Sequence, residues 1–280
     1  GWDVPRQSRG WNATNMMRFC TSVIELIGHT PLLKLERLAG GRQIYAKCEF
    51  MNPLSLKDRP VLQIIRDAED SGQLKPGGTL LEATSGNTGI GLALVCAVKG
   101  YRLLLAMSES ASVERRKILQ AMGAEIRLTP AHLGTDGAIE EAYGLARENP
   151  DTYFIPDQFN NEANWKAHYY GTAEEVWQQT DGKVTAFVAT LGTSGTLMGV
   201  SRRLKEYDSS IQIIGVEPYL GHKIQGLKNM KEAYCPEIFE KELTIRAAAG
   251  STPTSFAEAV RLMQTGDFAT DALVWRAVGL

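Results

Sequence analysis

The stretch Thr79-Leu80-Leu81-Glu82-Ala83-Thr84-Ser85-Gly86-Asn87-Thr88, followed by a mostly apolar run to Val98, predicts a strand, a turn and a helix in immediate succession. The pattern returns twice downstream. Strands are expected over residues 102–107 and 125–128, and helices over residues 113–122 and 136–147. Strands that alternate with helices of about ten residues are typical of a mostly parallel sheet covered by helices.

The same alternation continues on both sides of this unit. Before it, the sequence predicts a short amphipathic helix from Ser22 with a stop at Gly28, strands from Pro31 and over residues 43–50, and a helix over residues 61–71. After it come strands over residues 153–155, 186–189 and 212–216, and helices over residues 164–178, 197–205 and near 226–232. Gly-rich strand-to-helix turns in both halves predict two α/β layers that face one cleft.

Composition narrows the class of partner. Of the 280 residues 30 are basic and 32 acidic, so no charge excess favours nucleic acid or a membrane surface. The four cysteines lack the spacing of metal ligands or disulfide frameworks, and no apolar run is long enough to span a membrane. We expect reduced thiols in a cytoplasmic protein, no metal, a disordered extension over residues 1–17, and a small neutral or anionic metabolite as ligand.

One lysine lies in a distinctive turn. Asn52-Pro53-Leu54-Ser55-Leu56-Lys57-Asp58-Arg59 precedes an apolar-periodic helix, which places Lys57 at a helix start. The positive end of the helix dipole disfavours a charged ammonium group there and makes the amine more nucleophilic. A deprotonated lysine is the group that forms an imine with an aldehyde cofactor.

Two hydroxyl-rich loops complement this lysine. Gly192-Thr193-Ser194-Gly195-Thr196 follows an apolar strand and opens a helix, so its N–H and hydroxyl groups suit a phosphate monoester. It matches neither the P-loop nor the dinucleotide-binding pattern. Thr84-Ser85-Gly86-Asn87-Thr88 offers a similar site for a carboxylate, although a capping turn explains it equally well. Together the three features suggest pyridoxal phosphate acting on an amino acid.

The motifs also resemble those of the cysteine synthase/cystathionine β-synthase family of pyridoxal-phosphate enzymes, from about Ser22 to about Phe239. The matching segments, in family order, are residues 52–59, 84–91, 158–159, 164–177 and 192–196. Residues 112–116 and 228–237 are most similar to the bacterial cysteine synthase B type. The resemblance implies a tryptophan synthase β-subunit-like fold, with two domains, three αβα layers and mostly parallel twisted sheets. Residues 18–51 and 156–280 would form the larger cofactor-binding domain, and residues 52–155 a smaller mobile domain.

The resemblance further implies site roles. Lys57 would carry the cofactor and act as base and acid at Cα, and Asn87 would bind the cofactor's 3′ oxygen. The cofactor phosphate would be bound by Gly192, Thr193, Ser194, Gly195 and Thr196. The substrate would be bound by Thr84, Ser85, Gly86, Thr88, Gln158, Gly226 and Lys228. Lys228 takes a place where an arginine selects a phosphorylated serine in some relatives, although a solvated helix lysine is the simpler interpretation.

The implied reaction forms L-cysteine from O-acetylserine or O-phosphoserine and a sulfur donor, in a homodimer, with closure of the Thr84 to Thr88 loop excluding water. One feature departs from the family: the Ser/Thr-rich turn that contacts the pyridine nitrogen is absent, which suggests a truncated or divergent C-terminus. Replacements for it would come from Thr252, Thr254, Ser255, Thr265 and Thr270. The alternatives are a catalytically weak relative that binds a partner such as a serine acetyltransferase tail, a cystathionine β-synthase, a diaminopropionate synthase or a serine/threonine dehydratase.

Overall fold

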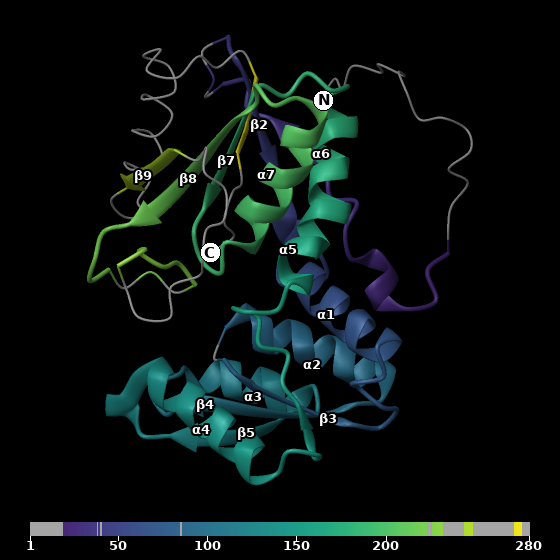
Figure 1. Cartoon of the computed structure of the whole chain (residues 1–280), viewed down its shortest axis with the longest axis vertical. Helices are drawn as coiled ribbons and strands as arrows, with labels where there is room; N and C mark the ends of the chain where they lie inside the picture. Colours follow the sequence, from purple (N-terminus) through teal and green to yellow (C-terminus); the bar gives the residue numbers. More distant parts are fainter. Residues whose placement is uncertain are drawn as a thin grey trace, which may run out of the picture.

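The computed structural model describes residues 19–37, 39, 41–84, 86–222, 224 and 226–231, together with the backbone of two further strands, residues 244–248 and 272–275. These residues form two α/β units, one above the other in Figure 1. Each unit is built on its own sheet. No helix in this part of the chain is long and apolar enough to cross a membrane.

The smaller unit has a four-stranded parallel sheet in the order β5-β4-β3-β6. Its strands are β3 (Thr79–Ala83), β4 (Arg102–Ser108), β5 (Glu125–Thr129) and β6 (Tyr153–Phe154). Its helices are α1 (Asp58–Asp70), α2 (Asn87–Lys99), α3 (Val113–Ala121) and α4 (Gly134–Glu148), with a 3-10 turn at Ala131–Leu133. Apolar residues of α1, α2 and α3 form one core with β3 and β4, while α4 packs through Ala138 and Ala142 on Leu81 and Ala106.

The larger unit has a six-stranded sheet in the order β1-β2-β10-β7-β8-β9. Its strands are β1 (Leu32–Lys34), β2 (Gln43–Lys47), β7 (Ala186–Thr190), β8 (Gln212–Pro218), β9 (Thr244–Ala248) and β10 (Ala272–Trp275). Only β1 runs antiparallel to its neighbour, and β10 lies between β2 and β7. The arrangement confirms the predicted α/β class with mostly parallel sheets.

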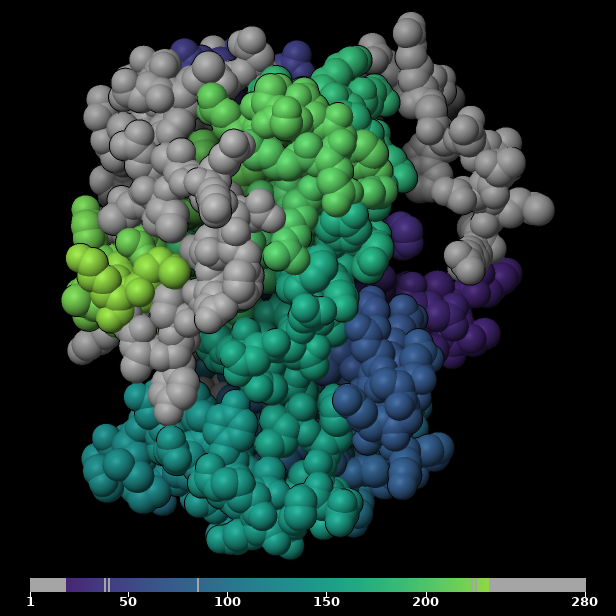
Figure 2. All heavy atoms as spheres, viewed as in Figure 1, coloured from purple at the N-terminus to yellow at the C-terminus, as the bar shows by residue number. Residues whose placement is uncertain are grey.

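One face of the larger sheet is covered by helices. These are α5 (Ala163–Ala167), a π-helical turn (His168–Thr172), α6 (Ala173–Gln179) and α7 (Gly195–Tyr207). Phe187 of β7 and Ile213 of β8 pack with apolar residues of α6 and α7. Figure 2 shows the α5 to α6 region, in teal, against α1, in blue, where the two units meet. The contact places the start of α1 between the two sheets.

Three local predictions need correction. The helix expected from Ser22 is only a 3-10 turn, Val23–Leu26, and the strand expected to Phe50 ends at Lys47 before a second 3-10 turn, Glu49–Met51. The helix expected near residues 226–232 is absent over 226–231, where the chain forms turns. There the backbone N–H groups of Lys228 and Met230 donate to Leu191 O and Glu217 Oε2, so the segment is tied to the ends of β7 and β8.

Candidate active site

The Lys57 turn is closed by hydrogen bonds to the residue that follows it. Asp58 Oδ2 accepts from the N–H groups of Leu54 (2.8 Å) and Ser55 (3.1 Å), and Ser55 Oγ accepts from Lys57 N–H (3.1 Å). Burial raises the pKa of Asp58, although these N–H groups act to lower it. The turn therefore delivers Lys57, immediately before α1, in a fixed backbone conformation.

Two other elements meet this turn. The Lys57 ammonium group donates to Thr193 Oγ1 at 3.3 Å, which joins the turn to the loop before α7. Gly91, in the first turns of α2, lies so close that a Cβ there would be 3.2 Å from Asp58 Oδ1 and 3.6 Å from Lys57 O. The N-terminal end of α2, where Asn87 begins the helix, therefore packs directly on the lysine turn.

The Gly192 to Thr196 loop has the geometry of an anion cradle. Ser194 adopts a left-handed conformation (φ 57°) just before α7, and N–H groups around such a residue converge on one point. Side chains are excluded at two glycines: a Cβ on Gly195 would lie 2.3 Å from Asn164 Oδ1, and one on Gly192 would lie 2.4 Å from Gly226 O. The cradle is thus lined by backbone and hydroxyl groups at the positive end of a helix.

The Thr84 to Thr88 loop reaches a second segment. Thr84 Oγ1 accepts from Gly86 N–H (3.2 Å), and Thr88 Oγ1 donates to Gln158 Oε1 (2.7 Å). Two predicted substrate-binding residues from distant parts of the chain are therefore in contact. Ser85 lies outside the described residues.

Asn164 links the two loops, and the sequence gave no individual reason to select it. Its Nδ2 group donates to Thr193 Oγ1 (2.9 Å) and to Gln158 O (2.7 Å). The side chain is buried, and Oδ1 accepts no hydrogen bond within the described chain. With the contacts above, Asn164 closes a ring of interactions through Lys57, Thr193, Gln158 and the start of α2.

The two remaining predicted residues lie beside the phosphate loop. Gly226 O is the atom that excludes a side chain at Gly192, and Lys228 N–H donates to Leu191 O (2.9 Å). The hydroxyl residues suggested as partners of a pyridine nitrogen, from Thr252 to Thr270, lie outside the described residues.

A buried ion cluster supports the lysine turn from the other side. Arg59 donates through Nε to Glu49 Oε2 (2.7 Å) and through NH1 to Glu175 Oε1 (2.7 Å), and Lys47 donates to Glu175 Oε2 (2.6 Å). Burial acts to raise the pKa of Glu175, but Arg59 and Lys47 hold it at about 2. Burial lowers the pKa of Lys47, more strongly than Glu175 raises it. The cluster ties α1 to β2 and α6 of the larger unit, and no sequence motif had indicated it.

These residues fit a phosphorylated aldehyde cofactor. The cradle before α7 accommodates a phosphate, the amine of Lys57 lies against its Thr193, and Asn87 opens a helix that packs on the same turn. The unpartnered Asn164 Oδ1 leaves an acceptor beside Gly195. Lys57 would hold the cofactor covalently, with its phosphate in the Gly192 to Thr196 loop.

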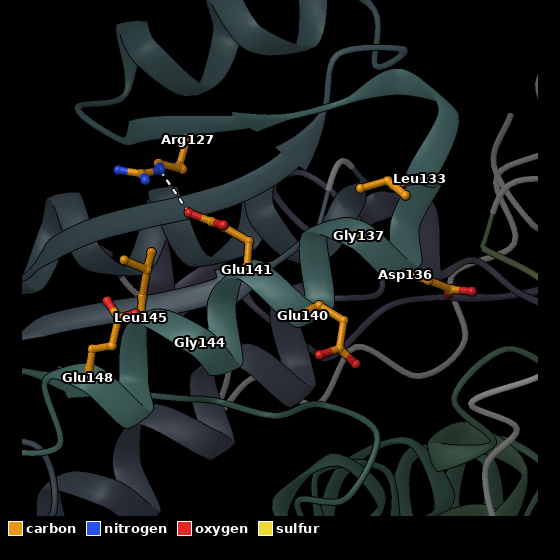
Figure 3. A pocket seen from close by; sticks show the side chains of 9 residues that line it. All are labelled: Arg127, Leu133, Asp136, Gly137, Glu140, Glu141, Gly144, Leu145 and Glu148. Atoms are coloured by element: carbon orange, nitrogen blue, oxygen red, sulfur yellow. Dashed lines mark ion pairs between the residues drawn. The ribbon is translucent and has the colours of Figure 1, made fainter.

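A separate surface groove does not take part. It has a volume of about 540 Å³ along α4 and is lined mainly by acidic and apolar side chains, with Arg127 paired to Glu141 at 2.8 Å (Figure 3). None of the predicted site residues lines it. The chemistry of this chain is therefore to be sought at the ring around Lys57.

Comparison with known proteins agrees with this geometry. The family model described as "Pyridoxal-phosphate dependent enzyme" matches residues 23–273. The chain belongs to this family. It is 44% identical to a cysteine synthase of Aquifex aeolicus over 84% of this chain and 74% of that protein. It is also 44% identical to cysteine synthase B of Pseudomonas aeruginosa, over 78% of this chain and 74% of that protein.

Solved structures of the family have the same fold. The crystal structure of O-ureido-L-serine synthase superposes with a TM-score of 0.81 at 31% identity, covering 93% of this chain and 92% of that one. Cysteine synthase from Entamoeba histolytica superposes with a TM-score of 0.78 at 39% identity, covering 86% of this chain and 76% of that one. The expected family and cofactor dependence are thereby confirmed.

Proposed function

We propose that this pyridoxal-phosphate dependent chain forms L-cysteine by replacing the activated hydroxyl group of a serine ester with a sulfur nucleophile. The contact between Lys57 Nζ and Thr193 Oγ1 carries the proposal, because it brings the predicted nucleophilic amine to the predicted phosphate loop. The similarity to cysteine synthases of both kinds supports the reaction class. O-acetylserine and O-phosphoserine are the two substrate candidates.

The chain's own residues have distinct tasks. Pyridoxal phosphate, when bound, supplies an electron sink for charge that develops at the substrate Cα. Lys57 holds the cofactor, and its amine, once released, takes the proton from Cα and later returns it. The hydrogen bond from Thr193 and the packing of Gly91 fix the position from which that amine works.

The substrate carboxylate would lie at the start of α2. Thr84, Gly86 and Thr88 offer hydroxyl and N–H groups there, and Gln158 orients the Thr88 hydroxyl. Ser85 completes the predicted loop. Movement of this loop toward the substrate would exclude water, which otherwise competes with the sulfur nucleophile.

An absorption spectrum tests the proposal directly. Protein incubated with pyridoxal phosphate should acquire a yellow band that shifts on addition of O-acetylserine or O-phosphoserine, and cysteine should appear once sulfide is added. Lys57→Ala should abolish the band, whereas Lys183→Ala, at an exposed lysine outside the site, should not. A protein that stays colourless with excess cofactor would refute the enzyme and support the alternative of a catalytically weak binding relative.

The predicted setting is part of the proposal. We infer a cytoplasmic homodimer, and we retain the C-terminal tail of a serine acetyltransferase as a candidate partner because such a tail carries a carboxylate that the α2 loop suits. Size-exclusion chromatography with light scattering tests the dimer. Competition between a synthetic tail peptide and O-acetylserine tests the partner.

A further inference from the structure

Glu82 is a buried carboxyl group at the base of the α2 loop. It is only 7% exposed, lies near the carboxyl end of β3 and precedes Thr84 by two residues. Oε1 accepts from the N–H group of Ala83 (3.1 Å), while Oε2 accepts no hydrogen bond in the described chain. No cationic side chain of that part of the chain forms an ion pair with it.

The surroundings of Glu82 disfavour its ionised form. Burial is the largest effect and raises the pKa of Glu82 to about 8, and the charge of Asp157 raises it further. The N–H groups of Ala83, Asp157 and Gln158 act in the opposite direction but do not compensate. Asp157 is the only charged side chain acting on Glu82 among the described residues, so the carboxyl group stays neutral at pH 7.

The location connects this group to the substrate. Glu82 faces the backbone of Asp157 and Gln158, and Gln158 Oε1 accepts the hydrogen bond of Thr88. The carboxyl group therefore lies between the strand that carries one side of the proposed carboxylate pocket and the segment that carries the other. A negative charge there would repel an anionic substrate group in that pocket.

We propose that Glu82 is a positioning residue that holds the Gln158 segment against the α2 loop as a neutral carboxyl group, and that its ionisation weakens binding of the amino-acid carboxylate. This inference rests on the proposed function. It predicts that substrate affinity falls in alkaline solution because of a group that does not itself touch the substrate.

The test compares wild-type protein with Glu82→Gln, which keeps the shape of the side chain and cannot ionise. Binding of L-serine to the cofactor-loaded protein is measured between about pH 6.5 and about pH 9.5. The ammonium group of L-serine titrates in both proteins, so the ratio of the two Kd values isolates Glu82. We expect wild-type Kd to rise roughly three- to tenfold relative to the variant across this range. A ratio that is constant with pH would overturn the proposal.

Two further measurements separate this outcome from failure of the proposed function or of folding. Infrared difference spectra of cofactor-free protein should show a protonated carboxyl group that disappears in alkaline solution in the wild type and in Glu125→Gln, an exposed glutamate of β5, but not in Glu82→Gln. Its absence from wild type would overturn the proposal even if L-serine did not bind.

Asp157→Asn provides the second check. Asp157 has a φ of 46°, which asparagine tolerates well, so this variant should fold. Loss of the Asp157 charge should move the midpoint of the Glu82 transition to lower pH, because that charge favours the neutral carboxyl group. An unchanged midpoint would show that another group titrates.

Discussion

At the scale of single residues, the hydroxyl group of Thr193 receives hydrogen bonds from two elements at once. Lys57 Nζ approaches it at 3.3 Å and Asn164 Nδ2 at 2.9 Å. A hydroxyl oxygen with two such donors keeps its own hydrogen directed elsewhere, which suits a neighbouring phosphate oxygen. Thr193 thus has a defined donor direction before any ligand arrives.

Gly195 gives a sharp residue-scale prediction. Gly195→Ala would place a Cβ 2.3 Å from Asn164 Oδ1, so Asn164 must move and release Thr193 or Gln158. We expect at least tenfold weaker binding of pyridoxal phosphate, measured by equilibrium dialysis, from loss of about 1.5 kcal/mol. Gly144→Ala, in α4 with open space around it, is the matched control and should gain about 0.5–1 kcal/mol of stability. Normal cofactor affinity in Gly195→Ala would contradict the cradle.

Lys228 offers a test of substrate choice. Its backbone borders the phosphate loop through the hydrogen bond to Leu191 O. If its ammonium group binds a substrate phosphate, Lys228→Ala should raise KM for O-phosphoserine about tenfold and leave KM for O-acetylserine unchanged. Steady-state kinetics with both substrates decides the matter. Equal effects on both would exclude Lys228 from phosphate selection.

At the scale of elements, helix α1 is anchored differently at its two ends. Arg59, in the first turn, is 6% exposed and pairs with Glu49 and Glu175 of the larger unit. Near the other end, Glu69 pairs with Lys99 at 2.7 Å in a partly exposed setting. The first pair fixes the position of Lys57, and the second fastens α1 to α2.

The two ends should respond unequally to substitution. Arg59→Met leaves two buried carboxylates without their main cation, so we expect a loss of about 3–5 kcal/mol of unfolding free energy by urea denaturation. Glu69→Gln should cost about 1 kcal/mol or less, because water screens that pair. Similar losses at both ends would contradict the view that the buried cluster anchors α1.

The elements also show what sequence patterns can predict. Strand β3 has the predicted bounds, and helices α2, α3 and α7 begin and end within two residues of prediction, because periodic apolar residues report local burial. The helix expected over residues 164–178 contains a π-helical turn instead. Gly199 of α7 packs so closely on it that a Cβ would lie 2.1 Å from Trp165 O. Such close backbone packing has no signature in the sequence of either helix alone.

The site was predictable in part for a related reason. Lys57 and the Gly192 to Thr196 loop carry local motifs, and the structure places them in contact. Asn164 and the partners of Arg59 carry no motif of their own. Glu175 is 116 residues from Arg59, and only the packing of α6 on β2 and α1 brings the two together. Interactions of this kind follow from the tertiary fold.

At the scale of the whole molecule, two buried glutamates impose opposite pH dependences on stability. Glu175 has its pKa lowered to about 2, so its contribution is full above about 4.5 and is lost as the pH falls toward 2. Glu82 has its pKa raised to about 8, so the folded state is progressively destabilised as the pH rises from about 4.5 to 8. Each effect is on the order of 3–4 kcal/mol.

Thermal unfolding of two variants separates these effects. Glu175→Gln should be less stable than wild type above pH 4.5, with the difference shrinking toward pH 2. Glu82→Gln should match wild type near pH 4.5 and exceed it in Tm above pH 8. Parallel pH profiles for wild type and either variant would exclude that glutamate as the source of the dependence.

Asn164 also imposes a thermodynamic symmetry on the two halves of the site. Its single amide group serves both the loop for the phosphate and the segment beside the carboxylate pocket. If filling one position alters how tightly this amide is held, affinity at the other changes, and linkage requires the reverse effect to have the same size. Inorganic phosphate and L-serine, added in either order to cofactor-free protein, should therefore alter each other's Kd by one common factor. In Asn164→Ala that factor should approach one.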